Sequence, residues 1–93
     1  MEIRNLVGHN GHSIKNQFVI TDKHGNTYFQ SYDKIIAKID TSGNITLDEK
    51  YWDCSATTRR NRNLFLALDS KEIKIYIRMK KITFTNLNKK KIA

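Results

Sequence analysis

The alternation of apolar and polar residues predicts short β-strands in the first half of the chain. In residues 13–21, every second position from Ile14 to Ile20 shares one face, and all but one of these positions are apolar, which is the two-residue period of a strand. Residues 27–31, TYFQS, are rich in the aromatic and β-branched residues that strands favour. Gly25 lies between the two segments in a polar stretch that marks a tight turn. Together these segments predict a β-hairpin.

A second pair of strands is predicted between residues 34 and 48. Residues 34–40, KIIAKID, form a short apolar run, and residues 45–48, ITLD, follow a polar turn that contains Gly43. Four strands joined by close turns form an antiparallel meander, with one face buried and the other in water.

After Ser55 the pattern changes, and a helix is predicted from Ala56 to about Leu68. Ser55 is a suitable N-cap, because its hydroxyl accepts a hydrogen bond from a free backbone N–H of the first turn. At about 100° per residue, five side chains share the side that we expect to be buried. These are Thr57, Asn61, Leu64, Phe65 and Leu68.

The arginines of this helix are the strongest candidates for contacting a partner. Arg59 and Arg62 are expected to point away from the buried side with Leu66 between them, and Arg60 is expected on a flank. Guanidinium groups bind phosphate and carboxylate through two parallel hydrogen bonds. The alternative is a helix face that is basic only because it lies in water. Thr58 lies in the first turn, where backbone amides favour an anion, although plain capping is the simpler role.

Residues 71–80, KEIKIYIRMK, fit two structures. Their isoleucines recur at every second position as in a strand, whereas Ile73, Tyr76 and Ile77 also form a helical stripe. The period alone does not decide between strand and helix in so short a run. Residues 82–88, ITFTNLN, alternate cleanly and predict a final strand.

Four short motifs are spread along the chain. They are F-Q-S-Y at residues 29–32, I-A at 36–37, W-x-x-S-x-T-T at 52–58 and F-L at 65–66. This pattern resembles a domain of unknown function common in small phage and mobile-element proteins of Gram-positive bacteria, and the likeness spans most of residues 15–88. Cys54 stands where an aromatic residue is common in such proteins, which argues against a functional thiol.

The resemblance implies a helix for residues 71–80. The predicted fold is therefore one α+β domain over residues 1–93: an antiparallel meander of about four strands, two short helices covering one sheet face, a returning strand, and a basic tail at residues 89–93. Small proteins of this origin include anti-CRISPR inhibitors. The resemblance thus implies binding to a host CRISPR effector nuclease, to its ribonucleoprotein complex, or to its guide-RNA or DNA channel.

Charge is distributed unevenly along the chain. Residues 1–50 carry six bases and six acids, whereas residues 51–93 carry eleven bases and three acids, which accounts for the whole net charge of +8. A neutral half joined to a strongly basic half is typical of proteins that bind polyanions. The alternative is that basic residues only keep the chain soluble.

Further residues are candidates for extending a basic surface. Tyr51 is a candidate for an exposed contact, whereas Trp52 is expected to anchor the helix start to the sheet rather than to stack on a base. The lysines that extend the surface are Lys80, Lys81, Lys89, Lys90 and Lys91.

The sequence offers little support for a metal or catalytic site. His9 and His12 lack a nearby cysteine or acid at ligand spacing, so a loop is the simpler interpretation. The aspartates near turns are not spaced to share one strand face, and no phosphate-binding glycine loop is present. We expect a non-enzymatic protein without cofactor or metal.

No apolar run reaches the roughly 18 residues of a membrane span, and a single cysteine suits a reducing cytoplasm. The resemblance implies that this is the cytoplasm of a bacterial host. The leading hypothesis is an inhibitor of a nucleic-acid-dependent host defence that acts through a basic helix face. The alternative is an accessory or regulatory protein that binds DNA or RNA phosphates directly, and a weaker third option is a homo-oligomeric structural module.

Overall fold

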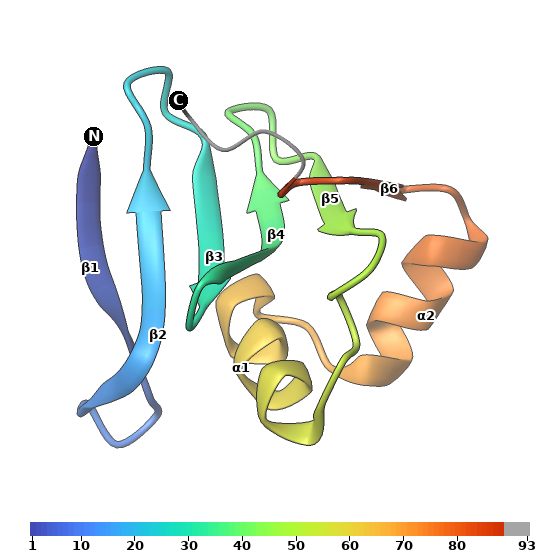
Figure 1. Cartoon of the computed structure of the whole chain (residues 1–93). Coiled ribbons are helices and arrows are strands. Elements are labelled where there is room, and N and C mark those ends of the chain that lie inside the picture. Colours follow the sequence, from blue (N-terminus) through green and yellow to red (C-terminus); the bar gives the residue numbers. More distant parts are fainter. Residues whose placement is uncertain (89–93) are drawn as a thin grey trace.

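The computed structural model describes residues 1–88 and contains six strands and two helices (Figure 1). In chain order these are β1 (Glu2–Val7), β2 (Ser13–Thr21), β3 (Thr27–Ser31), β4 (Lys34–Ile39), β5 (Ile45–Asp48), α1 (Ala56–Leu66), α2 (Ser70–Arg78) and β6 (Ile82–Thr85). The predicted α+β class is confirmed, but the sheet is larger than the predicted meander of about four strands.

All six strands form one mixed sheet in the order β1-β2-β3-β4-β5-β6. The first five pair antiparallel with their neighbours, and β6 pairs parallel to β5. A parallel neighbour requires a crossover connection, and here α1 and α2 provide it. The two helices thus form the connection along the chain from β5 to β6.

Sequence reasoning missed β1 because its side chains do not alternate between core and solvent. Of its six residues only Leu6 is buried, and the pairing with β2 shifts register between Asn5 and Val7. An edge strand with one buried residue gives no two-residue hydrophobic period.

Two of the hairpin turns share one construction. In the β2–β3 turn the Asp22 carboxylate accepts the backbone N–H of Asn26 at 3.0 Å, and in the β4–β5 turn Asp40 accepts that of Asn44 at 2.9 Å. In both turns a glycine takes a left-handed conformation, which only glycine adopts without strain. The D-x-x-G-N spacing therefore sets both turns.

The core lies between the helices and one face of the sheet. A cross-strand row of Val19, Phe29, Ala37 and Leu47 is buried on this face. Phe65 of α1 stacks on Phe29 with ring centroids 5.8 Å apart. The complete buried apolar cluster also includes Leu6, Ile36, Leu66, Ile73 and Ile82. Residues from both helices thus share one core with the sheet.

The helix predicted for residues 71–80 is confirmed as α2. It begins with a capping box in which Asp69 and Glu72 each accept the other's backbone N–H. The first helix ends at Leu66, two residues before the predicted end, because Ala67 takes a left-handed conformation with φ 57°. The strand β6 ends three residues before the predicted end, because the Asn88 side chain there bonds the backbone of Ile35 instead.

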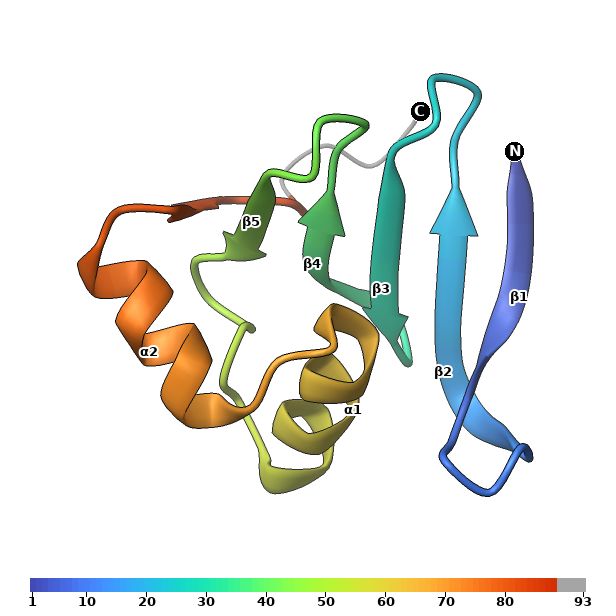
Figure 2. The same cartoon turned by 180° about the vertical axis from the view of Figure 1, so that it is seen from behind.

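The helices lie toward one end of the molecule. In both views the β1–β2 hairpin stands on one side, α2 on the other and α1 between them (Figure 2). Neither helix within residues 1–88 combines the length and apolar character needed to cross a membrane.

Candidate anion-binding surface

The three arginines of α1 do not form one face, which corrects the prediction. Arg59 turns toward Asp53, with Nε 2.8 Å from Oδ1. Arg60 is exposed on the side nearer the β1–β2 turn. Arg62 is only 1% exposed and is among the largest fully buried side chains. The predicted basic face of α1 is therefore divided, and only Arg60 is freely exposed.

The guanidinium of Arg62 is held by contacts in the interior. Its Nε and Nη2 donate to Asn63 Oδ1 at 3.1 and 2.9 Å. Its Nη1 donates to the Trp52 carbonyl at 2.8 Å and to Asp53 Oδ1 at 3.2 Å. Burial lowers the pKa of Arg62, against the opposing effect of Asp53, but an arginine stays protonated in proteins. These contacts give Arg62 a structural role.

The predicted buried side of α1 was correct for Asn61, and its Leu64, Phe65 and Leu68 pack against the core, but it was wrong for Thr57 and incomplete. Thr57 is exposed, whereas Thr58 and Leu66 are buried together with Arg62. The physical reason is that the helix has neighbours other than the sheet, because its Asn63 Nδ2 donates to Ser70 Oγ of α2 at 3.0 Å. The signal available in the sequence was Leu66, an apolar residue on the side assigned to solvent.

Thr58 is the residue whose backbone N–H is capped at the start of α1, and it is not an exposed contact. Its backbone N–H donates to Ser55 Oγ at 3.0 Å, which confirms Ser55 as the N-cap. Its hydroxyl oxygen lies 3.0 Å from the same Ser55 oxygen and accepts from it. At 5% exposure the side chain of Thr58 lies inside the fold.

Asp53 is the acid that pairs with the α1 arginines. Arg59 Nε and Arg62 Nη1 both reach its Oδ1, at 2.8 and 3.2 Å. Partial burial acts to raise the pKa of Asp53, but the hydrogen bonds and charges of the two arginines prevail, so this pKa lies below its usual value. One carboxylate therefore faces two guanidinium groups.

The aromatic pair before α1 is half-buried. Trp52 meets Phe84 of β6 edge to face, with centroids 5.4 Å apart, and packs against the core, which confirms its predicted anchoring role. The ring of Tyr51 has the ammonium groups of Lys34 and Lys50 at 5.2 and 5.4 Å from its centroid. Tyr51 thus lies in a basic neighbourhood but also packs on the core.

A basic surface lies on α2, where sequence reasoning did not place it. Lys71, Lys74 and Arg78 are all exposed, and their spacing of three and four residues puts them on one side of the helix. We call these three residues the basic face of α2. The signal was in the sequence, because these three bases have helical spacing within the helix already predicted for residues 71–80.

Lys80 and Lys81 are exposed in the turn after α2. Lys80 takes a left-handed conformation with φ 60°, and the Lys81 N–H donates to the Tyr76 carbonyl at 2.8 Å, which closes the helix end. Both lysines line a hollow beside the β4–β5 turn, where Asp40 is also found. The predicted contacts Lys89, Lys90 and Lys91 lie outside the described residues.

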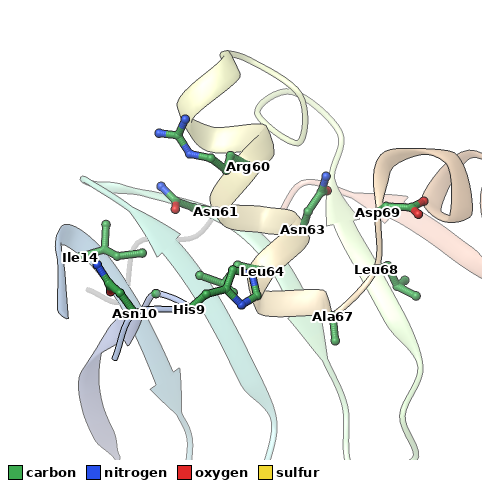
Figure 3. Close-up of a pocket in the computed structure, with 11 residues that line it drawn as sticks. His9, Asn10, Ile14, Arg60, Asn61, Asn63, Leu64, Ala67, Leu68 and Asp69 are labelled. Carbon is green, nitrogen blue, oxygen red and sulfur yellow. The ribbon is translucent and has the colours of Figure 1, made fainter. Parts of the chain in front are cut away.

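An open groove of about 950 Å³ separates the β1–β2 turn from α1 (Figure 3). Ile14, Leu64 and Leu68 give it apolar walls. Arg60 lies at one end of the labelled residues and Asp69 at another (Figure 3). His9 lines this groove, but residues 1–88 contain no group of three or more His, Cys, Asp or Glu side chains arranged for a metal ion.

A smaller hollow of about 290 Å³ lies between α1 and α2. We call it the α1–α2 hollow. Its walls combine basic groups from both helices with the loop that precedes α1. The lining residues are Trp52, Asp53, Arg59, Arg62, Ser70, Ile73 and Lys74.

The chain belongs to the Family of unknown function (DUF8033), which matches residues 1–85. The match covers all eight helices and strands and ends at Thr85, the last residue of β6. It confirms the predicted resemblance at the level of a family of unknown function. No curated protein and no solved structure matches the chain.

Proposed function

Because that family has no assigned function, we propose from the geometry that this protein is a non-enzymatic binding protein whose basic α2 face contacts the phosphates of a nucleic acid. The observation that carries the proposal is the row of exposed cations Lys71, Lys74 and Arg78. Seven residues of helix span about 10 Å. One strand of a duplex carries a phosphate about every 3.4 Å along the axis, so this row matches about three phosphates.

The charge around this row supports an anionic partner. Glu72 is the one acid within α2, and its carboxylate accepts the Asp69 backbone N–H at 2.9 Å in the capping box. Nearby Asp53 is paired with Arg59 and Arg62. Within residues 1–88 none of the three cations of the basic face forms an ion pair, so they remain for an external anion.

The same acids explain why the proposal is binding and not catalysis. A nuclease needs carboxylates converging on a metal, or a positioned base within reach of the substrate. Here Asp53 holds two arginines and Asp69 accepts the Glu72 backbone N–H at 2.7 Å. These carboxylates have structural roles that account for their positions.

A second candidate function rests on two exposed apolar side chains beside the cations. Ile75 and Met79 of the α2 region are 36% and 54% exposed. Phosphates gain nothing from such side chains, whereas a protein surface does. These side chains favour a protein partner. From them and the resemblance to phage and mobile-element proteins, we propose as the second candidate an inhibitor in the bacterial host cytoplasm that docks on a nucleic-acid-dependent defence complex such as a CRISPR effector nuclease. In this version α2, and not α1, is the docking helix.

The proposed function is tested by fluorescence anisotropy of labelled single-stranded DNA, duplex DNA and structured RNA at several salt concentrations. Three phosphate contacts predict a log–log salt slope of roughly −2.7 on duplex DNA. Weak binding with a flat salt response would contradict direct phosphate recognition. Saturable binding to an effector nuclease complex in a fixed ratio, with weak binding to free nucleic acid, would favour the second candidate.

A further inference from the structure

The α1–α2 hollow gathers more positive than negative charge in a small space. Arg59 and Arg62 enter it from α1 and Lys74 from α2, whereas Asp53 is its one acid. A hollow of about 290 Å³ lies just below the roughly 300–1,000 Å³ typical of pockets for drug-sized ligands. The excess of positive charge favours an anion, and the volume admits a small one.

Several donors around this hollow remain unused. A guanidinium has five N–H groups, and the four hydrogen bonds of the buried Arg62 leave at least one Nη2 N–H without a partner among residues 1–88. The Nη groups of Arg59 have no hydrogen-bond partner in this part of the chain, because only its Nε is bonded. Lys74 forms no ion pair with any described residue.

Asp53 does not occupy all the N–H donors of Arg59 and Arg62. Both arginines contact the same oxygen, Oδ1, through Arg59 Nε and Arg62 Nη1. One carboxylate carries one negative charge against the three positive charges that line the hollow. A buried guanidinium with an unused N–H carries a desolvation cost unless a further acceptor is bound.

From this arrangement we infer that the α1–α2 hollow binds a single phosphate-type oxyanion, held by Arg59, Arg62 and Lys74. The anion is either free phosphate or a backbone phosphate of a nucleic acid. As a backbone-phosphate site the inference rests on the proposed function, because Lys74 belongs to both the hollow and the basic face of α2. As a free-phosphate site the inference does not depend on the proposed function.

The test titrates inorganic phosphate into the ¹⁵N-labelled protein at constant ionic strength, with chloride replacing phosphate in the control. We expect saturable shifts of the Arg59 and Arg62 Nε–H resonances and of the Lys74 amide. Lys74→Met keeps much of the side-chain bulk and removes the charge. One charge-assisted hydrogen bond corresponds to about tenfold in affinity, so this variant is expected to bind phosphate about tenfold more weakly.

Lys71→Met is the matched control, because it removes another exposed lysine of α2 that does not line the hollow. Its phosphate affinity is expected to change less than twofold. Linear shifts without saturation, or equal losses in the two variants, would overturn the inference.

A second titration with a short single-stranded DNA separates this inference from the proposed function. Saturable phosphate binding without DNA binding would retain the oxyanion site and refute the proposed function. If both variants lose DNA binding equally and the wild type does not bind inorganic phosphate, the basic face of α2 is supported and the oxyanion site in the hollow is refuted. DNA binding that blocks the phosphate shifts identifies the backbone phosphate as the anion.

Discussion

The guanidinium of Arg62 lies over the ring of Trp52, with Cζ 5.3 Å from the ring centroid, and its Nη1 also donates to the Trp52 carbonyl at 2.8 Å. The Arg62 side chain of α1 thus contacts both the ring and the backbone of Trp52 in the preceding loop. Trp52 in turn packs against Phe84 of β6. This relationship links the start of the helical crossover to the strand that completes it.

Replacing Arg62 with Ala is expected to destabilise the fold by about 3 kcal/mol, because buried acceptors lose their donors and a cavity remains. The measurement is urea unfolding followed by circular dichroism. Arg60→Ala, at an exposed position on the same helix, is the control and is expected to change stability by less than about 0.5 kcal/mol. Equal effects of the two substitutions would mean that Arg62 is not buried in solution.

Asp53 is expected to make stability depend on pH in the acid range. Its pKa is lowered in the fold, so the ionised carboxylate favours the folded state. This contribution is complete above the ordinary carboxyl pKa of about 3.9 and is lost as the pH falls through the lower folded pKa.

The check is the difference in unfolding free energy between wild type and Asp53→Asn. This difference is expected to be constant from pH 7 to about 5 and to shrink as the pH falls below about 3.9. Asp22 and Asp40 also have lowered pKa values, but they titrate in both proteins and cancel. A difference that does not change with pH would contradict the ion-pair assignment.

Asp48 is buried and accepts four hydrogen bonds, from the backbone N–H groups of Lys50, Tyr51 and Leu87 and from Asn88 Nδ2. An asparagine has one acceptor oxygen, and its amide group would face donors. Asp48→Asn is therefore expected to cost about 2–3 kcal/mol in chemical denaturation. Glu49→Gln, at the exposed neighbour, is the control, and a similarly small effect of both substitutions would refute this account.

Ala67 ends α1 in a left-handed conformation with φ 57°, which favours glycine. Ala67→Gly is expected to stabilise the fold by about 1 kcal/mol, seen as a rise in Tm of roughly 4–8 °C for a domain of this size. Ala56→Gly, at the first helical residue of α1, is the matched control and is expected to lower Tm. A fall in Tm for Ala67→Gly would contradict the strained conformation.

Parts of the fold follow from local sequence signals. Gly25 and Gly43 determine where two turns fall, and Ser55 determines where α1 begins, because each acts within a few residues along the chain. The strand β1 escaped prediction because an edge strand with one buried residue shows no period. The helical state of α2 was inferred from the family resemblance and not from its period.

The candidate site was less predictable because it depends on which surfaces meet. Arg62 was expected in solvent, since arginine is rarely buried without a partner, but Trp52, Asp53 and Asn63 supply those partners in three dimensions. The row of Lys71, Lys74 and Arg78, by contrast, has helical spacing within the helix predicted for residues 71–80, so it could have been recognised from the sequence.

The most direct test of the central claim compares two variants of equal net charge. One replaces the basic face of α2, as Lys71→Gln, Lys74→Gln and Arg78→Gln. The other replaces three exposed bases of the first two strands and the following turn, as Arg4→Gln, Lys15→Gln and Lys23→Gln. Each change lowers the net charge from +8 by three, so non-specific attraction falls equally.

The measurement is anisotropy of a labelled duplex DNA across a salt series. The account predicts that the α2 variant loses most of its affinity and that its log–log salt slope becomes shallower by roughly 2.7, while the β-hairpin variant stays close to wild type. Equal losses in both variants, or unchanged binding by the α2 variant, would contradict the assignment of phosphate contacts to α2.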